Sequence, residues 1–314
     1  MRVLIVGGGG FIGQALVARL RLNGHLDGQR CSRVTVLDQH ISGQIDDPLL
    51  RYVEADIGVR SVLEQCIADG ADCVFHLASV TGGAAERDFE LGMKVNLHSM
   101  LGLLEALRAA GSRPKLVFAS SIAVYGVPLP QLVDEQTLPL PTLSYGVQKL
   151  IGEQLVADYS RRGFIDGCSL RIPGIVARPP SAGMLSGFLS DLIRELSAGR
   201  EFVCPVAASG QSWLMSRSGI IDNLLHAASL SDAQRAERRT WLLPVLHLSM
   251  SALVQAIARQ HGAQVLQRVS YRPQSELQAQ FANYPPLHCP ASLAAGFRHD
   301  GDAERLIARA LEPI

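Results

Sequence analysis

Residues 3–13 read VLIVGGGGFIG, an apolar run that leads directly into four glycines, an apolar pair and a further glycine. A short apolar run bounded by turn residues is typical of a buried strand. Gly7, Gly10 and Gly13 have GxxGxxG spacing, which suits a tight turn, a close approach of backbone to a pyrophosphate, and a helix N-terminus whose free N–H groups bind that anion. We expect Phe11 and Ile12 to pack the helix on the sheet beside the dinucleotide. The alternative is that the glycines form only a flexible turn.

Asp38 ends a second expected strand at residues 34–37, at about the distance downstream where a ribose-binding acid is found in such folds. A carboxylate there accepts hydrogen bonds from the hydroxyls of an adenosine ribose and repels a 2′-phosphate. Gln39 and His40 follow, so no arginine is present to bind that phosphate. These residues favour NAD over NADP. The alternative for Asp38 is a strand end that merely faces solvent.

Short apolar runs alternate with helical patterns along the first half of the chain. Further strands are expected at residues 52–56, 73–77, 116–119 and 170–172, and later helices at 188–198, 220–230 and 249–260. This alternation predicts an α/β fold, a doubly wound Rossmann sheet of parallel strands with helices on both faces. We expect residues 1–172 to form the NAD-binding domain, with a segment near 215–248 returning to it. Residues 173–314 are expected to form mainly a smaller, interleaved substrate-binding region.

Two long helices are expected in the first half of the chain. One covers residues 89–107 and carries an apolar stripe at Met93, Leu97, Leu101, Leu104 and Leu107. The other begins near Thr142 or Ser144, either of which can cap it, and runs to about Arg162.

Tyr145 and Lys149 are four residues apart, so on a helix both side chains project from one face. A tyrosine is a poor base because its reference pKa is about 10. Bringing the pKa of Tyr145 towards neutrality requires about 4 kcal/mol, which we expect from the Lys149 ammonium and the positive nicotinamide ring. Ser121 ends the fifth strand, where open α/β sheets bind ligands, and its hydroxyl can hold the substrate oxygen. The alternative is that Tyr145 and Lys149 belong to an ordinary amphipathic helix face.

Composition excludes several other classes of protein. Lys+Arg and Asp+Glu both number 29, so no net charge attracts nucleic acid or an anionic membrane. We find no apolar stretch near the ~20 residues of a membrane span and no signal peptide, so a cytoplasmic protein is expected. The six cysteines include no CxxC pair, and no HExxH or GxSxG motif occurs, so we predict neither a metal site nor a hydrolase.

Over residues 1–180 the chain resembles the extended short-chain dehydrogenase/reductases, the NAD-dependent epimerase/dehydratase family. The resemblance is carried by the glycine loop, Asp38, residues 56–57, 76–79, Asn96, 120–126, Tyr145 and Lys149. It implies that Asp56 and Ile57 hold adenine, and that Ser121, Tyr145 and Lys149 are the catalytic set. The other residues that it places at the cofactor are Leu77, Ala78, Ser79, Asn96 and Pro173. It also implies a homodimer, formed through helices near 89–107 and 144–162.

Longer strings resemble members of the family that oxidise a short sugar acid. They are residues 144–153, 158–164, 171–173, 178–179, 204–206 and 213–214. The resemblance implies an enzyme that oxidises D-erythronate at C2 to 2-dehydro-D-erythronate with NAD.

The residues around Ser121 favour a dehydrogenase of a small acid. Ile122 and Ala123 cannot transfer protons, which argues against a dehydratase. Many sugar-nucleotide enzymes of the family carry Asn where Pro173-Gly174 stands here. The alternatives are a sugar-nucleotide epimerase and a non-catalytic NAD-binding sensor.

A carboxylate substrate requires cations or N–H donors. Arg178 and Arg217 are candidates, although either can equally be a solvated surface residue. Thr81 and Ile122 are further candidates for the substrate pocket. Trp213 either forms a wall of that pocket or lies in a core.

Overall fold

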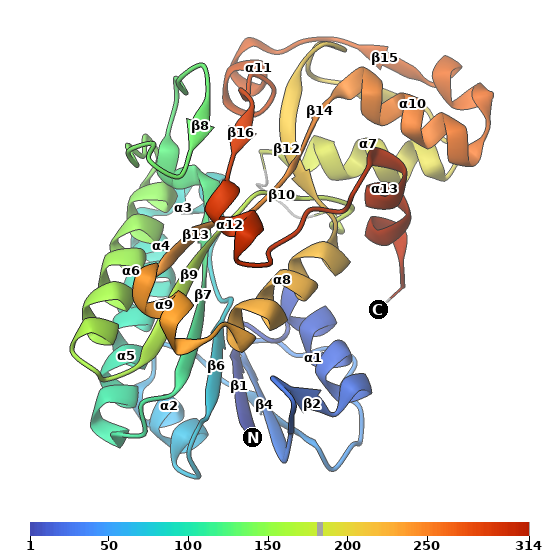
Figure 1. Cartoon of the computed structure of the whole chain (residues 1–314). Helices are drawn as coiled ribbons and strands as arrows, with labels where there is room; N and C mark the ends of the chain where they lie inside the picture. Colours follow the sequence, from blue (N-terminus) through green and yellow to red (C-terminus); the bar gives the residue numbers. More distant parts are fainter. Residues whose placement is uncertain (181–184, 314) are drawn as a thin grey trace.

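Seven parallel strands form the central sheet of the computed structural model, which describes residues 1–180 and 185–313 (Figure 1). Their spatial order is β13-β9-β7-β6-β1-β4-β5. Their bounds are β1 (Arg2–Val6), β4 (Arg33–Asp38), β5 (Leu50–Glu54), β6 (Cys73–His76), β7 (Lys115–Ser121), β9 (Asp166–Ile172) and β13 (Thr240–Leu242). The prediction of a doubly wound α/β sheet is therefore confirmed. From β1 the chain adds β4 and β5 on one side of the sheet, and then β6, β7, β9 and β13 on the other side. The strand order therefore reverses between β1 and β6, where folds of this kind bind ligands.

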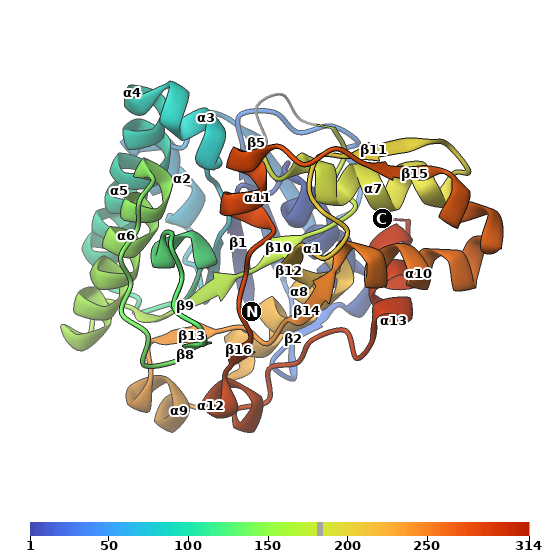
Figure 2. The same cartoon turned by 90° about the horizontal axis from the view of Figure 1, so that it is seen from above.

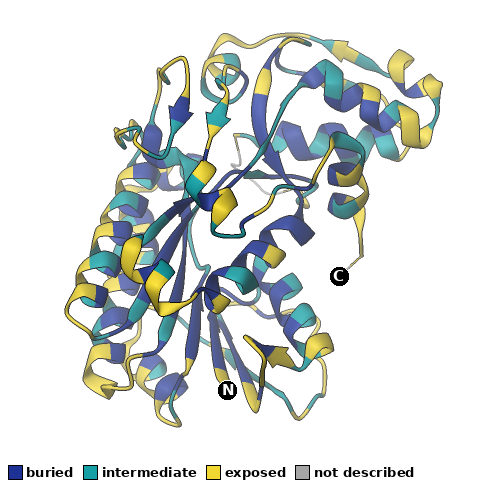
Figure 3. Ribbon diagram, viewed as in Figure 1, coloured by how far each residue is buried: buried dark blue, intermediate teal, exposed yellow. Residues whose placement is uncertain are grey.

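Helices cover both faces of the sheet (Figure 2). Alternate residues of β1 contact the two layers. Val3 and Ile5 pack with α1 (Phe11–Asn23) and α8 (Arg217–Ser229) on one face. Leu4 and Val6 pack on the other face with α2 (Arg60–Ile67), α5 (Ser99–Ala110) and α6 (Ser144–Arg161). This burial on both faces explains why the strands read as continuous apolar runs, and Figure 3 shows them dark against exposed outer helix faces.

The apolar stripe predicted over residues 89–107 is wrong in its register. The segment consists of α4 (Phe89–Gly92), a π-helical turn (η1, Met93–His98) and α5. Leu101 is 40% exposed, whereas Met100 and Leu103 are buried together with Leu104 and Leu107. A π turn contains more residues than an α turn and so rotates the face that follows it.

The predicted start of α6 is confirmed, but the predicted caps are wrong. The N-cap residue is Leu143, which provides no side-chain hydrogen bond. Thr142 accepts from the Val127 N–H instead, and the Ser144 N–H donates to Glu86. Contacts with distant segments therefore replace local capping at this end of the helix.

A second, smaller region packs beside the carboxyl ends of the sheet. It contains a three-stranded sheet of β10 (Gly174–Ile175), β12 (Gln211–Met215) and β14 (Leu246–Ser249). Three helices, α7 (Gly187–Ser197), α10 (Met250–His261) and α13 (Ala303–Leu311), share an apolar core with it.

The chain between these elements makes shorter ones. They are the hairpin β2 (His25–Leu26) and β3 (Gln29–Arg30), α3 (Gly82–Arg87), η2 (Ile122–Tyr125), β8 (Val133–Asp134), β11 (Phe202–Cys204), α9 (Asp232–Glu237), η3 (Ala263–Gln267), β15 (Val269–Tyr271), α11 (Ser275–Phe281), β16 (Leu287–His288) and α12 (Pro290–Ala294). Of the helices in residues 1–180 and 185–313, none combines the length and the hydropathy that a membrane span requires.

Candidate active site

The glycine loop joins β1 to α1 at the point where the strand order reverses. Gly7 has φ +89°, and a Cβ on it would lie 2.4 Å from the Ala78 nitrogen. A Cβ on Gly13 would lie 2.2 Å from the Gly7 carbonyl oxygen, so only glycine lets the helix approach the turn this closely. No side chain caps α1 at Gly10, which leaves its first N–H groups available to an anion.

Asp38 lies against this loop from the end of β4. Its carboxylate accepts from the Gly9 N–H at 2.9 Å and from the Gln39 N–H at 2.7 Å. The carboxylate is thereby fixed beside the loop, as expected for a residue that binds a ribose.

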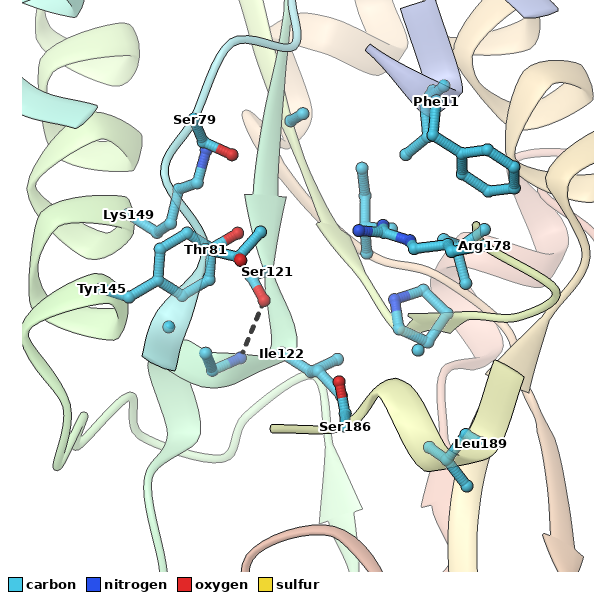
Figure 4. A pocket seen from close by; sticks show the side chains of 18 of the residues that line it. Phe11, Ser79, Thr81, Ser121, Ile122, Tyr145, Lys149, Arg178, Ser186 and Leu189 are labelled. Atoms are coloured by element: carbon cyan, nitrogen blue, oxygen red, sulfur yellow. Dashed lines mark hydrogen bonds between the residues drawn. The ribbon is translucent and has the colours of Figure 1, made fainter. Parts of the chain in front are cut away.

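A cavity of about 320 Å³ begins at the glycine loop and extends between the sheet and the smaller region. The predicted site residues that line it are Gly7, Gly10, Phe11, Ile12, Gly13, Leu77, Ser79, Thr81, Ser121, Ile122, Tyr145, Lys149, Pro173, Arg178 and Trp213. Figure 4 shows that Tyr145 and Lys149 project from α6, while Arg178 and Phe11 lie across the cavity from them. Predicted residues from six separate stretches of the chain therefore meet in one space.

The three predicted catalytic residues lie together on one side of this cavity. The Lys149 ammonium lies 5.5 Å from the centre of the Tyr145 ring and 4.9 Å from that of Phe118. The Ser121 hydroxyl accepts from the Ala123 N–H at 3.1 Å, which caps the short helix η2 and leaves the hydroxyl facing the cavity (Figure 4).

The electrostatics around Tyr145 differ from the expectation. Burial raises the pKa of Tyr145, and the main opposing influences are the charge of Arg178 and hydrogen bonding with Ser79 and Ser121. Burial also lowers the pKa of Lys149 to about 7. The cation that most lowers the pKa of Tyr145 in this cavity is therefore Arg178 rather than Lys149.

Arg178 and Arg217 flank the same ring but differ in what their guanidinium groups contact. They lie 5.7 Å and 5.2 Å from the centre of the Phe11 ring, respectively. Arg217 donates to the Glu312 carbonyl and does not line the cavity. Arg178 lines the cavity, and its Nε atom is buried without a hydrogen-bond partner among the described residues. Of the two predicted candidates, Arg178 alone presents its charge to the cavity.

Five other predicted site residues do not line the cavity. They are Asp38, Asp56, Ile57, Ala78 and Asn96. Asp56 pairs with Lys94 at 2.8 Å, and this hydrogen bond lowers the pKa of the carboxyl group. Buried Asn96 bonds both backbone groups of Val80 and the Gln148 side chain, so it holds the loop that follows β6.

The family model that describes the NAD dependent epimerase/dehydratase family matches residues 3–214. The chain belongs to this family. It is 40% identical over 319 aligned positions to D-erythronate dehydrogenase of Cupriavidus necator, a match that covers 99% of this chain and 98% of the relative. It is 29% identical to D-erythronate dehydrogenase of Haemophilus influenzae over 99% of both chains.

A solved structure with a similar fold has a different name. The crystal structure of the nucleoside-diphosphate-sugar epimerase from Agrobacterium tumefaciens has a TM-score of 0.89 at 31% identity, covering 98% of this chain and 92% of that one. The fold alone therefore does not separate dehydrogenases from epimerases in this family.

The features of a member of this NAD-dependent family are present at the glycine loop. The close glycine packing, the uncapped start of α1 and the fixed Asp38 carboxylate together fit a dinucleotide. The lining residues Leu77, Ser79 and Pro173 continue this surface towards Tyr145 and Lys149.

One wall of the cavity combines the predicted Trp213 with residues that the sequence did not indicate. Trp213 is 1% exposed, and its indole N–H donates to the Pro285 carbonyl at 2.7 Å. Its ring lies 4.7 Å from that of Tyr284, which also lines the cavity. The other lining residues of the smaller region that no prediction named are Ile175, Val176, Leu185, Ser186, Leu189, Ser190, Ser212 and Phe281. They follow no motif or spacing, so only the tertiary structure reveals them.

Proposed function

We propose that the protein oxidises a short sugar acid with NAD, and that the substrate is D-erythronate, oxidised at C2 to 2-dehydro-D-erythronate. One observation carries this proposal: a single cavity contains the Tyr145 phenol, the Ser121 hydroxyl and the guanidinium of Arg178. A 2-hydroxy acid needs a proton acceptor at its hydroxyl and a cation at its carboxylate. Two relatives named D-erythronate dehydrogenase, matched over nearly their whole length, support the same substrate.

Each catalytic residue has a defined task in this reaction. Ser121 donates a hydrogen bond to the C2 oxygen and orients it, and Tyr145 removes the proton of that hydroxyl. NAD, held by the glycine loop, Asp38 and Lys149, supplies the two-electron oxidant when it is bound. Lys149 contributes positive charge beside the phenol when protonated, and Arg178 lowers the pKa of Tyr145 from across the cavity.

The substrate side of the cavity has an aromatic wall. We assign this side to the smaller region, in residues 173–314, and the dinucleotide side to the strands and helices of residues 1–172 with α8 and β13. Trp213 and Tyr284 close the wall, and the Tyr284 backbone is held by His247, whose Nε2 lies 2.7 Å from its carbonyl oxygen. A wall fixed in this way favours a four-carbon acid over a sugar nucleotide.

The test is a steady-state assay of NADH formation with a panel of four-carbon sugar acids. D-erythronate is expected to give the highest kcat/KM, and Tyr145→Phe is expected to abolish turnover because it removes the proton acceptor while keeping the ring. Absence of NADH formation at millimolar D-erythronate would refute the substrate assignment. Tightly retained NAD and turnover of a UDP-sugar without net NADH would identify an epimerase instead.

We also propose a homodimer formed through α4, α5 and α6. Phe89, Leu101, Val147 and Ile151 on these helices are 58%, 40%, 42% and 38% exposed. Burying such side chains against a second copy contributes about 25 cal/mol for each Å² removed from water. Light scattering after size exclusion tests this: Val147→Asp with Ile151→Asp should give a monomer, and an unchanged dimer would exclude this face. The cytoplasmic location stays a prediction, which cell fractionation tests.

A further inference from the structure

A buried ion pair joins α6, the helix that carries Tyr145 and Lys149, to strand β9. Glu153 on α6 is 1% exposed, and Arg171 on β9 donates hydrogen bonds to both oxygens of its carboxylate, the shortest with Nε–Oε1 at 3.0 Å and Nη2–Oε2 at 2.8 Å. Glu153 is four residues beyond Lys149 and eight beyond Tyr145, so all three lie along one face of the helix. The pair therefore ties the catalytic face of α6 to the sheet.

The same pair holds both ends of the segment that carries Ser121. At one end, the Ser120 hydroxyl donates to Glu153 Oε1 at 2.5 Å. At the other, the Arg171 guanidinium donates to the Tyr125 hydroxyl at 3.0 Å and lies 5.1 Å from the centre of its ring. Ser121 is the N-cap of the short helix η2 between these two anchors. Its position relative to α6 is consequently set through Glu153 and Arg171.

We propose that Glu153 and Arg171 are positioning residues that hold the Ser121 hydroxyl in register with the Tyr145 phenol. Neither touches the reacting atoms. They act through Ser120 and Tyr125, which anchor the segment that contains Ser121. This anchoring affects turnover because a shift of one ångström in a catalytic group can lower turnover substantially. This inference rests on the proposed function only in giving Ser121 and Tyr145 their catalytic tasks.

A matched cluster at the opposite end of β9 provides a control. Asp166 accepts from Arg235 and from Arg239, each at 2.6 Å, and Arg235 is 1% exposed. Asp166 is thus also a carboxylate paired with arginines, but it lies at the amino end of β9 and does not line the cavity. A purely structural role for Glu153 predicts that both carboxylates behave alike when removed.

The experiment compares Glu153→Gln, Ser120→Ala and Asp166→Asn with the parent chain, at a temperature where all are folded. Glu153→Gln should lower kcat at least tenfold and leave the KM for NAD within twofold. Ser120→Ala, which retains the ion pair and so the fold, should lower kcat by a smaller factor. Asp166→Asn should lower the Tm while kcat stays unchanged.

A second measurement does not depend on turnover. Hydrogen bonding with Ser121 acts to lower the pKa of Tyr145, so a displaced Ser121 should move the Tyr145 titration to higher pH. The titration of this phenol is obtained by subtracting the absorbance titration curve of the Tyr145→Phe derivative from that of the corresponding chain with Tyr145. An alkaline shift in Glu153→Gln but not in Asp166→Asn supports the proposal, even if no sugar acid is turned over. The proposal would be overturned if Glu153→Gln and Ser120→Ala both left kcat and the Tyr145 titration unchanged. It would also be overturned if Asp166→Asn changed kcat and the Tyr145 titration as much as Glu153→Gln does.

Discussion

Replacing Arg178 with methionine should separate activity from stability. The variant keeps the length of the stem but removes the charge that faces the cavity. In the free protein, the Arg178 Nε atom is buried without a partner among the described residues, so its removal relieves a desolvation cost. The loss of its contact with the Phe11 ring, 5.7 Å away, acts in the opposite direction by about 0.5–1 kcal/mol. We therefore expect little change in Tm.

The expected loss of activity follows from the contact that Arg178 would make with the carboxylate of the proposed substrate. Hydrogen bonds to charged groups contribute about 1.5–3 kcal/mol. At about 1.36 kcal/mol for each tenfold change, kcat/KM for D-erythronate should fall about 10- to 150-fold. Because Arg178 also acts to lower the pKa of Tyr145, the variant needs a higher pH to ionise the phenol. The rising limb of the pH profile should therefore move to higher pH.

Arg217→Met is the matched control, since Arg217 lies over the same Phe11 ring but donates to the Glu312 carbonyl. It should lower the Tm and leave kcat/KM near that of the parent chain. The two variants are compared by NADH formation across pH 6–10 and by thermal denaturation. If Arg178→Met keeps kcat/KM within twofold, or if both variants lose activity alike, the carboxylate does not bind at Arg178.

Three further changes test other parts of the site. Asp38→Ala should raise the KM for NAD about tenfold and narrow the preference for NAD over NADP, because it removes a hydrogen-bond acceptor for the ribose and a charge that repels the 2′-phosphate. An unchanged ratio of the KM for NADP to the KM for NAD would contradict this prediction. Gly13→Ala should lower the Tm of the cofactor-free protein strongly, since its Cβ would meet the Gly7 carbonyl oxygen at 2.2 Å, whereas Gly10→Ala, whose nearest contact is at 3.4 Å, should leave it nearly unchanged. Burial lowers the pKa of Lys149 to about 7 from 10.5, so the unfolded chain binds an extra proton between these values and stability rises with pH across that window. Lys149→Met should therefore have a higher Tm than the parent chain, and this difference in Tm should shrink from pH 7 to pH 9. A difference in Tm that stays constant with pH would argue against a neutral buried amine.

Local patterns were sufficient to predict the parts of the fold that depend on neighbouring residues. The apolar run at residues 3–6 and the glycines after it predicted β1, the turn and α1, because strand burial and glycine conformation are properties of the local sequence. Helix α8, by contrast, shares a core with β1 across some two hundred residues. The seventh strand, β13, is only three residues long and becomes a strand through its pairing with β9.

The sequence by itself determined the chemistry available to this protein: which residue can accept a proton, which can orient a hydroxyl and which turn can admit a pyrophosphate. Only the tertiary structure decided which charges act on that chemistry. Arg178 and Arg217 are equivalent candidates in the sequence, but burial and the position of Glu312 direct one into the cavity and the other away from it. Burial likewise places the pKa of Lys149 near 7. Desolvation and charge pairing depend on the distances between segments that are far apart in the chain, and no local pattern encodes those distances.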